Sequence, residues 1–306
     1  MKHFELLKLV AVFAILILLF QLAEFANLRK SLRSDEVSGQ IITLRNRGSE
    51  VKVNLEKITN ELLQAKKVLP VRWQGIPHKL VAGNIIDIEK LKNYSRRYGQ
   101  TLTAEDLKIF EKDYQGNIEI TPNNSVLIYN ILWAAGFYNK SPILDYELEK
   151  YGWETVKNLA GYYFSFANLG NGSTLPQAGY NYFDLIQLSK DQKDLTMKIA
   201  GKSAVPSCGN ALHLPDCSCS FAIDALIVMM ASQGFSEQQI YQAMKDIYPY
   251  RFPGIYVQHA LLYKLDKNQN WPEVNPEELV GINMSSAQGV AYMRKTLANI
   301  LANTTQ

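Results

Sequence analysis

The segment SFAIDALIVMMASQG, residues 220–234, constrains the fold more than any other stretch of the sequence, because it is apolar on nearly every face of a helix. A helix with that pattern has to be buried on all sides. Gly234 is typical of the residue that ends such a helix. Ser236 and Gln239 then form the capping box of a second helix, EQQIYQAMKDIY. The sequence therefore predicts an αα-hairpin inside the core.

Several other segments also predict helices. Thr103 and Asp106 form a capping box ahead of LKIFEKDY. The run NSVLIYNILWAAGF predicts an apolar helix that is capped by Asn124 and ends at Gly136. Two further helical runs are ELEKYGWETVKNLAGYYFSF, interrupted at Gly152, and DLIQLSKDQKDLTMKIAGKS. We find few convincing strands and no repeat, so we expect a mainly α fold.

The amino terminus carries an apolar run, Leu9 to Phe20, that predicts a membrane anchor. With Gln21 included and Lys8 reaching outward, the segment extends to about 20 residues, enough to cross ~30 Å of hydrocarbon. A cleaved signal peptide needs small residues at its cleavage site, where this chain has Gln21 or Glu24. We therefore expect an uncleaved single-pass transmembrane signal anchor at residues 1–28.

The anchor leads to an expected location and domain order. A short tail before a signal anchor usually stays inside the cell, so we expect a cell-membrane protein with most of its chain extracytoplasmic, although Arg29, Lys30 and Arg33 favour the opposite orientation. The expected order is an anchor (1–28), a juxtamembrane tether with an amphipathic helix (29–68), a helical body (69–270) and a carboxyl-terminal extension with a terminal helix (271–306). Leu55, Ile58, Leu62 and Ala65 lie at helical spacing, as in a short coiled-coil stalk or a helix packed on the body.

All three cysteines lie in one short segment, SCGNALHLPDCSCS at residues 207–220, with a histidine between them. Cys208, His213, Cys217 and Cys219 read C-x4-H-x3-C-x-C, a ligand set that can close a tetrahedron around zinc. Copper(I) is the alternative ion for thiolates. The segment precedes the predicted buried helix, whose free N–H groups favour thiolate over thiol. We expect a structural metal site here.

Other roles for the three cysteines stay open. Cys208 can form a disulfide with either later cysteine, the pair can be a redox centre, or all three can be reduced core residues. If four protein ligands surround the metal, no position remains for a substrate, which argues against an enzyme. Asp216 and Asp224 are candidates for hydrogen-bonding support of the ligands. His259, alone on an apolar helix, is expected to be structural.

Charge and aromatic content bear on the partners. The net charge of +3 and the scattered Lys and Arg residues exclude a nucleic-acid-binding surface. The clusters YYFSF and YPYRF, with Trp133 and Trp153, could stack on sugar rings. We therefore keep an envelope protein or a glycan as a candidate partner, besides the membrane that the anchor implies.

The motifs CGN…LPDC-S-C, MMASQGFSEQQIYQAM and YRFPGIY, with NILWAAGFYNKSPIL upstream, resemble a group of single-pass bacterial membrane proteins without an assigned activity. The resemblance covers about residues 120–265 and the segment at Ser285 and Ser286. In that group a second cysteine often stands where this chain has Ser207, and a histidine where it has Cys219. An exchange of histidine for cysteine suits a metal ligand better than a disulfide, so the resemblance implies metal binding.

A second resemblance points to thiol chemistry. The thiol reductases of cytochrome c maturation and small Cys-rich bacterial lipoproteins place a cysteine pair before a helix that ends in G-x-S. This chain has Gly234-Phe235-Ser236 at that place, but its pair is C-x-C and not C-x-x-C. The resemblance implies a thiol-disulfide or copper-handling protein, which we keep as the second hypothesis. A binding module whose cysteines only brace the fold is the third.

Overall fold

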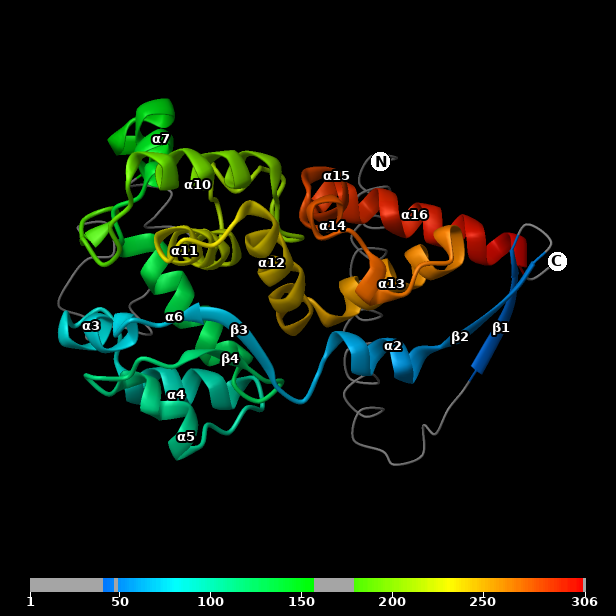
Figure 1. The fold of residues 1–306 in the computed structure, drawn as a ribbon, viewed down its shortest axis with the longest axis horizontal. Coiled ribbons are helices and arrows are strands. Elements are labelled where there is room, and N and C mark those ends of the chain that lie inside the picture. Colours follow the sequence, from blue (N-terminus) through cyan, green and yellow to red (C-terminus); the bar gives the residue numbers. More distant parts are fainter. Residues whose placement is uncertain (1–40, 47–48, 157–178, 305–306) are drawn as a thin grey trace, which may run out of the picture.

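The computed structural model describes residues 41–46, 49–156 and 179–304, and this part is mainly helical, as predicted (Figure 1). The helices of its first half are α2 (Leu55–Leu62), α3 (Ile76–Ala82), α4 (Ile88–Arg97), α5 (Ala104–Leu107), α6 (Ser125–Tyr138) and α7 (Pro142–Tyr151). The second half contains α10 (Lys190–Lys202), α11 (Ser218–Ser232), α12 (Glu237–Arg251), α13 (Pro253–Lys267), α14 (Pro276–Val280), α15 (Ile282–Ser285) and α16 (Ala287–Thr304). Two 3-10 turns, Lys108–Phe110 and Trp271–Glu273, complete the helical part.

The predicted transmembrane anchor is corrected by the structure. Within residues 41–46, 49–156 and 179–304, no helix combines the length and the apolar character that a bilayer crossing requires. The segment predicted to be the anchor, residues 1–28, lies outside the described residues. We therefore withdraw the single-pass membrane architecture and the cell-membrane location that we inferred from it.

The centre of the fold is the contact between α6 and α11, the two most apolar helices. A Cβ added at Gly136 of α6 would lie 1.9 Å from the backbone oxygen of Phe221 in α11, so the two backbones approach to a distance that only glycine allows. The ring of Phe137 packs edge-on against that of Phe221, with centroids 5.4 Å apart. Helix α6 continues to Tyr138, so Gly136 does not end it as predicted but permits the close packing.

Three helices enclose α11. It packs against α10 and α12 as well as α6, and α7 packs against α10 (Figure 1). All residues of α11 from Cys219 to Ala231 are buried, as the apolar segment predicted. Gly234 follows the helix with a φ of 80°, a conformation that glycine adopts without strain, and it turns the chain into α12. The predicted αα-hairpin is thus confirmed.

The capping predictions have mixed outcomes. The capping box of Thr103 and Asp106 and that of Ser236 and Gln239 are both present. Asn124 stands at the amino end of α6, but its side chain forms no bond to the first turn of the helix. It accepts a hydrogen bond from the N–H of Thr121 at 2.8 Å and donates one to Asp106 at 2.9 Å. It therefore links the segment before α6 to α5 instead of capping α6.

Two small antiparallel sheets were not predicted. Strands β1 (Ile41–Asn46) and β2 (Ser49–Asn54) pair with each other, and β3 (Lys67–Arg72) pairs with β4 (Asn117–Ile120) with a register shift between Val68 and Arg72. Strand β4 packs against α6, and β3 packs against α11 and α12, while α4 packs directly against α6.

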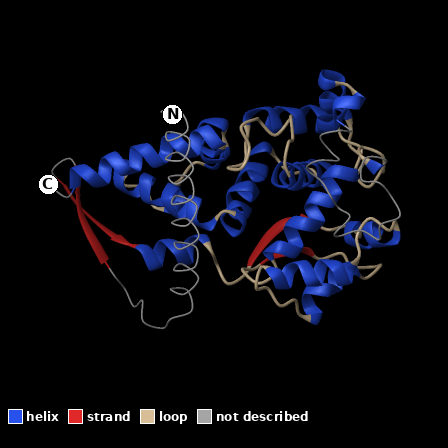
Figure 2. Cartoon of the chain, turned by 180° about the vertical axis from the view of Figure 1, so that it is seen from behind, coloured by secondary structure: helices blue, strands red, loops and turns tan. Residues whose placement is uncertain are grey.

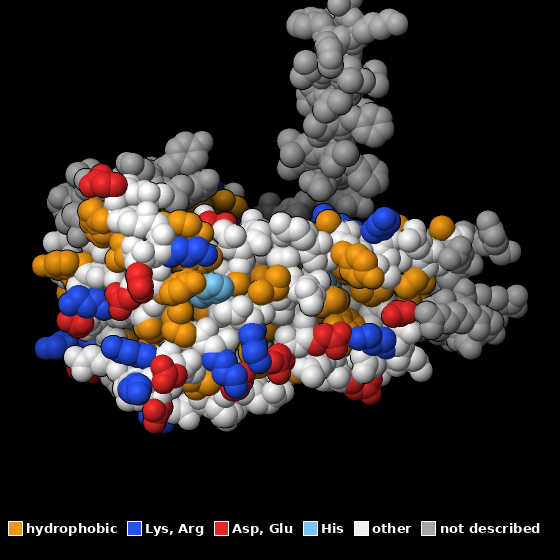
Figure 3. Space-filling view, turned by 90° about the horizontal axis from the view of Figure 1, so that it is seen from above, with side chains coloured by type: hydrophobic (Ala, Val, Ile, Leu, Met, Phe, Trp, Pro, Cys, Tyr) orange, Lys and Arg blue, Asp and Glu red, His pale blue; other side chains and the backbone are white. Residues whose placement is uncertain are grey.

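The carboxyl-terminal helices form the other side of the molecule. Helix α13 packs against α16, and α2 packs against α13 (Figure 2). Val53, Leu265 and Leu297 form a small apolar cluster there, separate from the main core. The helical spacing from Leu55 onward therefore belongs to a helix packed on the body and not to a stalk. On the face shown in Figure 3, acidic and basic side chains are intermixed.

Candidate functional site

The candidate site is built on the amino end of α11. Cys217 is the N-cap residue of this helix, as its place before the apolar segment predicted. The Ser220 N–H donates to the Cys217 Sγ at 3.4 Å, and the Cys217 N–H donates to the Ser220 Oγ at 3.1 Å. A sulfur in this position accepts a hydrogen bond from the helix and lies at the positive end of the helix dipole. Both effects stabilise a thiolate.

Cys217 forms a disulfide with Cys208, and the two Cα atoms are 6.8 Å apart. The two sulfurs differ in their surroundings, since Cys208 is only 3% exposed whereas Cys217 is half-buried. The Cys208 carbonyl accepts a hydrogen bond from the Ala287 N–H at 2.9 Å, which ties this half of the pair to the start of α16. The Ser207 Oγ lies 3.6 Å from one sulfur and 3.3 Å from the other.

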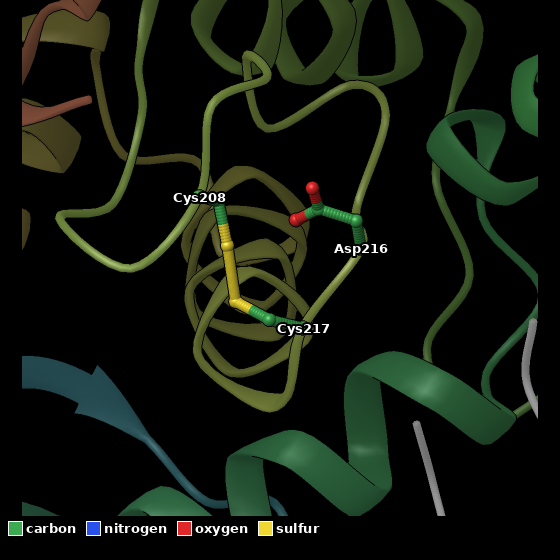
Figure 4. Close-up of side chains that lie close together, drawn as sticks. All are labelled: Cys208, Asp216 and Cys217. Atoms are coloured by element: carbon green, nitrogen blue, oxygen red, sulfur yellow. A yellow bond between two sulfur atoms is a disulfide. The ribbon is translucent and has the colours of Figure 1, made fainter. Parts of the chain in front are cut away.

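A carboxylate lies next to the disulfide. Figure 4 shows Asp216 directed toward Cys208 and Cys217, and the potential ligand atoms of the three residues lie within 4.8 Å of one another. Burial raises the pKa of Asp216, although a hydrogen bond from the Asn210 side chain at 3.2 Å opposes the shift. Protons therefore remain on this carboxyl group to a higher pH than on an exposed aspartate.

His213 does not join this group. The backbone N–H of His213 donates to the Ala200 carbonyl at 3.2 Å, which holds the loop against α10. The His213 ring packs against the ring of Tyr146, with centroids 5.3 Å apart. The buried Nδ1 atom has no hydrogen-bond partner among the described residues. Burial lowers the pKa of His213, so the ring is neutral at pH 7.

Cys219 points away from the disulfide. It is a free, buried thiol whose Sγ accepts a hydrogen bond from the Arg251 Nε at 3.3 Å. Cys217, the N-cap residue, has an extended backbone, whereas Cys219 lies in the first turn of α11, so the two side chains take different directions. The four predicted ligands Cys208, His213, Cys217 and Cys219 are thus not assembled around one point, and only the first and third of them meet.

Asp224 also lies away from the disulfide group. It is 2% exposed, and neither carboxylate oxygen has a hydrogen-bond partner among the described residues. Burial raises the pKa of Asp224 well above its usual value, and the nearby Glu147 adds to the shift. Glu147 itself accepts a hydrogen bond from the Tyr180 hydroxyl. Burial raises the pKa of Glu147 to about 7, so these two acids favour their protonated forms inside the core.

The sequence analysis missed a pocket on the Cys219 side of α11. It has a volume of about 330 Å³, and its walls include Tyr94, Trp133, Cys219 and Arg251. The segment YPYRF drew attention only for its aromatic residues, whereas its arginine is the residue that reaches the buried thiol. The available signal was the position of Arg251 at the end of the second helix of the hairpin, close to the start of the first.

Comparison with known proteins gives no further guide to this site. Models of protein families, the curated proteins and the solved structures were all searched with this chain, and none of them matches it. The chemistry of the site therefore has to be argued from its own geometry.

Proposed function

We propose that this chain is a thiol–disulfide exchange protein whose working pair is Cys208 and Cys217. The observation that carries the proposal is the asymmetry of the disulfide. It joins a half-buried sulfur at the N-cap of a 15-residue helix to a sulfur that is 3% exposed. An accessible, stabilised thiolate paired with a protected second thiol is the arrangement that exchange chemistry requires.

The reaction follows from this asymmetry. In the reduced protein the Cys217 thiolate attacks a sulfur of a partner disulfide, forms a mixed disulfide and releases the first partner thiolate. The Cys208 thiolate then attacks the Cys217 Sγ, which forms the intramolecular bond and releases the second partner thiol. Two electrons pass from the pair to the partner, and the two protons lost by the cysteines end on the partner thiols. The reverse sequence oxidises a partner dithiol.

Asp216 is suited to carry a proton in the second step. Its carboxyl group lies within 4.8 Å of both sulfurs, and burial raises its pKa. An aspartate whose pKa is raised can accept the proton of the Cys208 thiol and return it to the leaving group. Replacement of Asp216 by Asn is therefore expected to slow the exchange and to change its pH profile, with the disulfide still able to form.

A cross-link without exchange activity is the alternative, and it makes a different prediction. A disulfide that closes a loop of about ten residues stabilises a fold by about 3 kcal/mol, because it lowers the conformational entropy of the unfolded chain. This effect does not depend on the reactivity of the sulfurs. Loss of stability on reduction therefore does not distinguish the two roles. The reactivity of Cys217 does.

The test uses the full chain and three single variants, Cys208→Ser, Cys217→Ser and Cys219→Ser. Each is reduced, mixed with oxidised glutathione and quenched with acid at set times, and mass spectrometry measures the adducts. We expect Cys208→Ser to accumulate glutathione on Cys217 rapidly, Cys217→Ser to react slowly, and the matched control Cys219→Ser to form the internal disulfide as the wild type does. If Cys217 in Cys208→Ser reacts no faster than free cysteine at the same pH, the proposal is wrong.

Zinc binding by the reduced pair is a second candidate, since a carboxylate accompanies the two sulfurs. Cys208, Asp216 and Cys217 would supply three ligands and leave a fourth position open, which differs from the closed shell expected from the sequence. Competition with a chromophoric chelator, for zinc and for copper(I), tests this in the reduced protein. Weaker zinc binding in Asp216→Asn, with unchanged binding in Cys219→Ser and His213→Ala, would support it, and equal loss in all three would contradict it.

A further inference from the structure

The pocket on the Cys219 side of α11 is separate from the disulfide and has its own chemistry. It lies between α4, α6, the start of α11 and the end of α12, and its volume of about 330 Å³ falls at the lower end of the range for small-molecule sites. Neither Cys208 nor Cys217 is among the described residues that line it. The ligand chemistry of this pocket is therefore independent of the proposed redox function.

Among the described residues, the only charged side chain in the pocket wall is that of Arg251. Its Nε donates to the Cys219 Sγ at 3.3 Å, and within the described part of the chain its guanidinium forms no ion pair with a carboxylate. Arg251 is exposed to solvent as a residue although it lies in the pocket wall. A guanidinium has five N–H donors, so one bond to sulfur leaves most of them for a ligand.

The start of α11 adds to the positive potential of the pocket. Ser218 and Cys219, the first two residues of this 15-residue helix, both line it. The N–H groups of the first helical residues have no acceptor within the helix, and the helix dipole favours an anion beside them. The Cys219 sulfur and the Phe252 ring, whose centroid is 6.0 Å from the guanidinium carbon, hold Arg251 in place. A fixed guanidinium loses little entropy when it binds an anion.

Apolar and aromatic side chains form much of the remaining wall, beside the polar side chains of Gln100, Asn123, Ser125 and Asn130. The rings of Tyr94 and Tyr98 lie 5.1 Å apart at the rim, and Val126, Trp133 and Pro253 line the pocket as well. Burial raises the pKa of Tyr94 to about 12, so its hydroxyl is neutral and does not repel an anion at pH 7. Flat apolar ligands pack well against such rings.

We infer that this pocket binds a small organic carboxylate with a flat apolar body, its carboxylate paired with Arg251 and its body against the aromatic wall. A guanidinium matches a carboxylate through two parallel hydrogen bonds, which gives the head group its orientation. No acidic side chain of the part of the chain that the structure describes lines the pocket, which favours an anion over a cation, and the aromatic lining favours a ring over a hydrated ion. A two-ring carboxylate with about 13 non-hydrogen atoms suits a pocket of this size.

The test compares 2-naphthoate with its neutral analogue 2-naphthylmethanol, using the full chain and fluorescence or calorimetric titration. We expect the wild type to bind the carboxylate at least tenfold more tightly than the alcohol. Arg251→Gln should weaken 2-naphthoate by about tenfold or more and leave the alcohol unchanged. Arg251→Lys, which keeps the charge but loses the paired geometry, should lie between them.

Two controls separate this pocket from other sites. Arg294→Gln removes an exposed arginine of α16 that bonds to Gln258, outside the pocket, and should leave both affinities unchanged. Cys217→Ser removes the disulfide and should also have no effect, so failure of the redox proposal leaves this one standing. The inference is overturned if the wild type binds both compounds equally, if it binds neither below millimolar concentration, or if Arg294→Gln matches Arg251→Gln. Should Arg251→Gln not fold, the wild-type comparison and Arg251→Lys decide the question.

Discussion

Replacement of Gly136 by Ala tests the packing of α6 on α11 directly. Helix propensity alone predicts that an alanine in place of a helical glycine stabilises the protein by about 1 kcal/mol. The structure predicts the opposite sign, since the new methyl group would lie 1.9 Å from the Phe221 oxygen and 2.8 Å from its carbonyl carbon. These are backbone atoms within a helix, so they cannot rotate away. The two helices have to separate by about 1 Å or more.

The expected magnitude follows from that separation. Overpacking of a close-packed core costs about 1–3 kcal/mol, and separation also loosens the other contacts along the two helices. We therefore expect Gly136→Ala to lower the free energy of unfolding by about 2 kcal/mol, after the gain in helix propensity is included. Urea unfolding of the full chain, followed by circular dichroism, measures the change.

Gly201 provides the matched control. It lies in α10, and a Cβ added there would have the His213 Nδ1 as its nearest neighbour, at 3.7 Å, an ordinary contact distance. Gly201→Ala is therefore expected to stabilise the protein by up to about 1 kcal/mol. If Gly136→Ala is as stable as the wild type or more so, the close approach of α6 and α11 is refuted. If both variants lose stability equally, steric contact is not the cause.

Three further predictions concern buried side chains that can carry a charge. Burial lowers the pKa of His259 from 6.5 to about 4. The stability that the neutral ring contributes is therefore present above pH 6.5, and the free energy of unfolding falls by about 3 kcal/mol as the pH drops through 4. His259→Leu should remove this loss, as measured by unfolding curves between pH 4 and 7. Burial raises the pKa of Glu147 from 4.5 to about 7. The stability that the protonated form contributes, about 3 kcal/mol, is therefore present below pH 4.5 and is lost as the pH rises through 7. A Glu147→Gln variant whose free energy of unfolding falls as steeply as that of the wild type over this range would contradict the prediction. Lys245 is 2% exposed and donates hydrogen bonds to the carbonyls of Trp271 at 2.8 Å and Val274 at 2.6 Å. Lys245→Met should leave these acceptors unpaired and lower the free energy of unfolding, measured in urea, by about 2–4 kcal/mol.

Local signals in the sequence account for the parts of the fold that could be predicted. The capping box of Ser236 and Gln239 and the glycine at 234 mark the turn of the hairpin within a few residues, so periodicity and caps suffice there. The hairpin of β1 and β2 also has a local signal, β-branched residues on both sides of Gly48, which we assigned to a tether instead. The pairing of β3 with β4 has none, because its two strands lie about 45 residues apart and only tertiary packing brings them together.

The sequence predicted where the candidate site lies, but not which residues come together in it. The sequence put Cys217 and Cys219 at the start of a buried helix, and the structure agrees. The extended backbone of Cys217 and the helical backbone of Cys219 then separate the two side chains, which spacing along the chain does not reveal. Asp216 was named as a supporting residue, and it proves to be the carboxylate nearest the sulfurs. Arg251 could not be found from local sequence, since it reaches Cys219 only through the folding of the hairpin.

The close contact of α6 with α11 also bears on how the chain reaches its native state. About 80 residues separate the two helices in sequence, so their docking closes a long loop, whereas α11 and α12 are joined by a short turn. We expect the hairpin to form early and the arrival of α6 to limit the folding rate. Gly136 of α6 faces the backbone carbonyl of Phe221 in α11. If α6 docked one helical turn out of register, a bulky side chain would face this carbonyl instead. Only one alignment of α6 on α11 therefore allows the close contact.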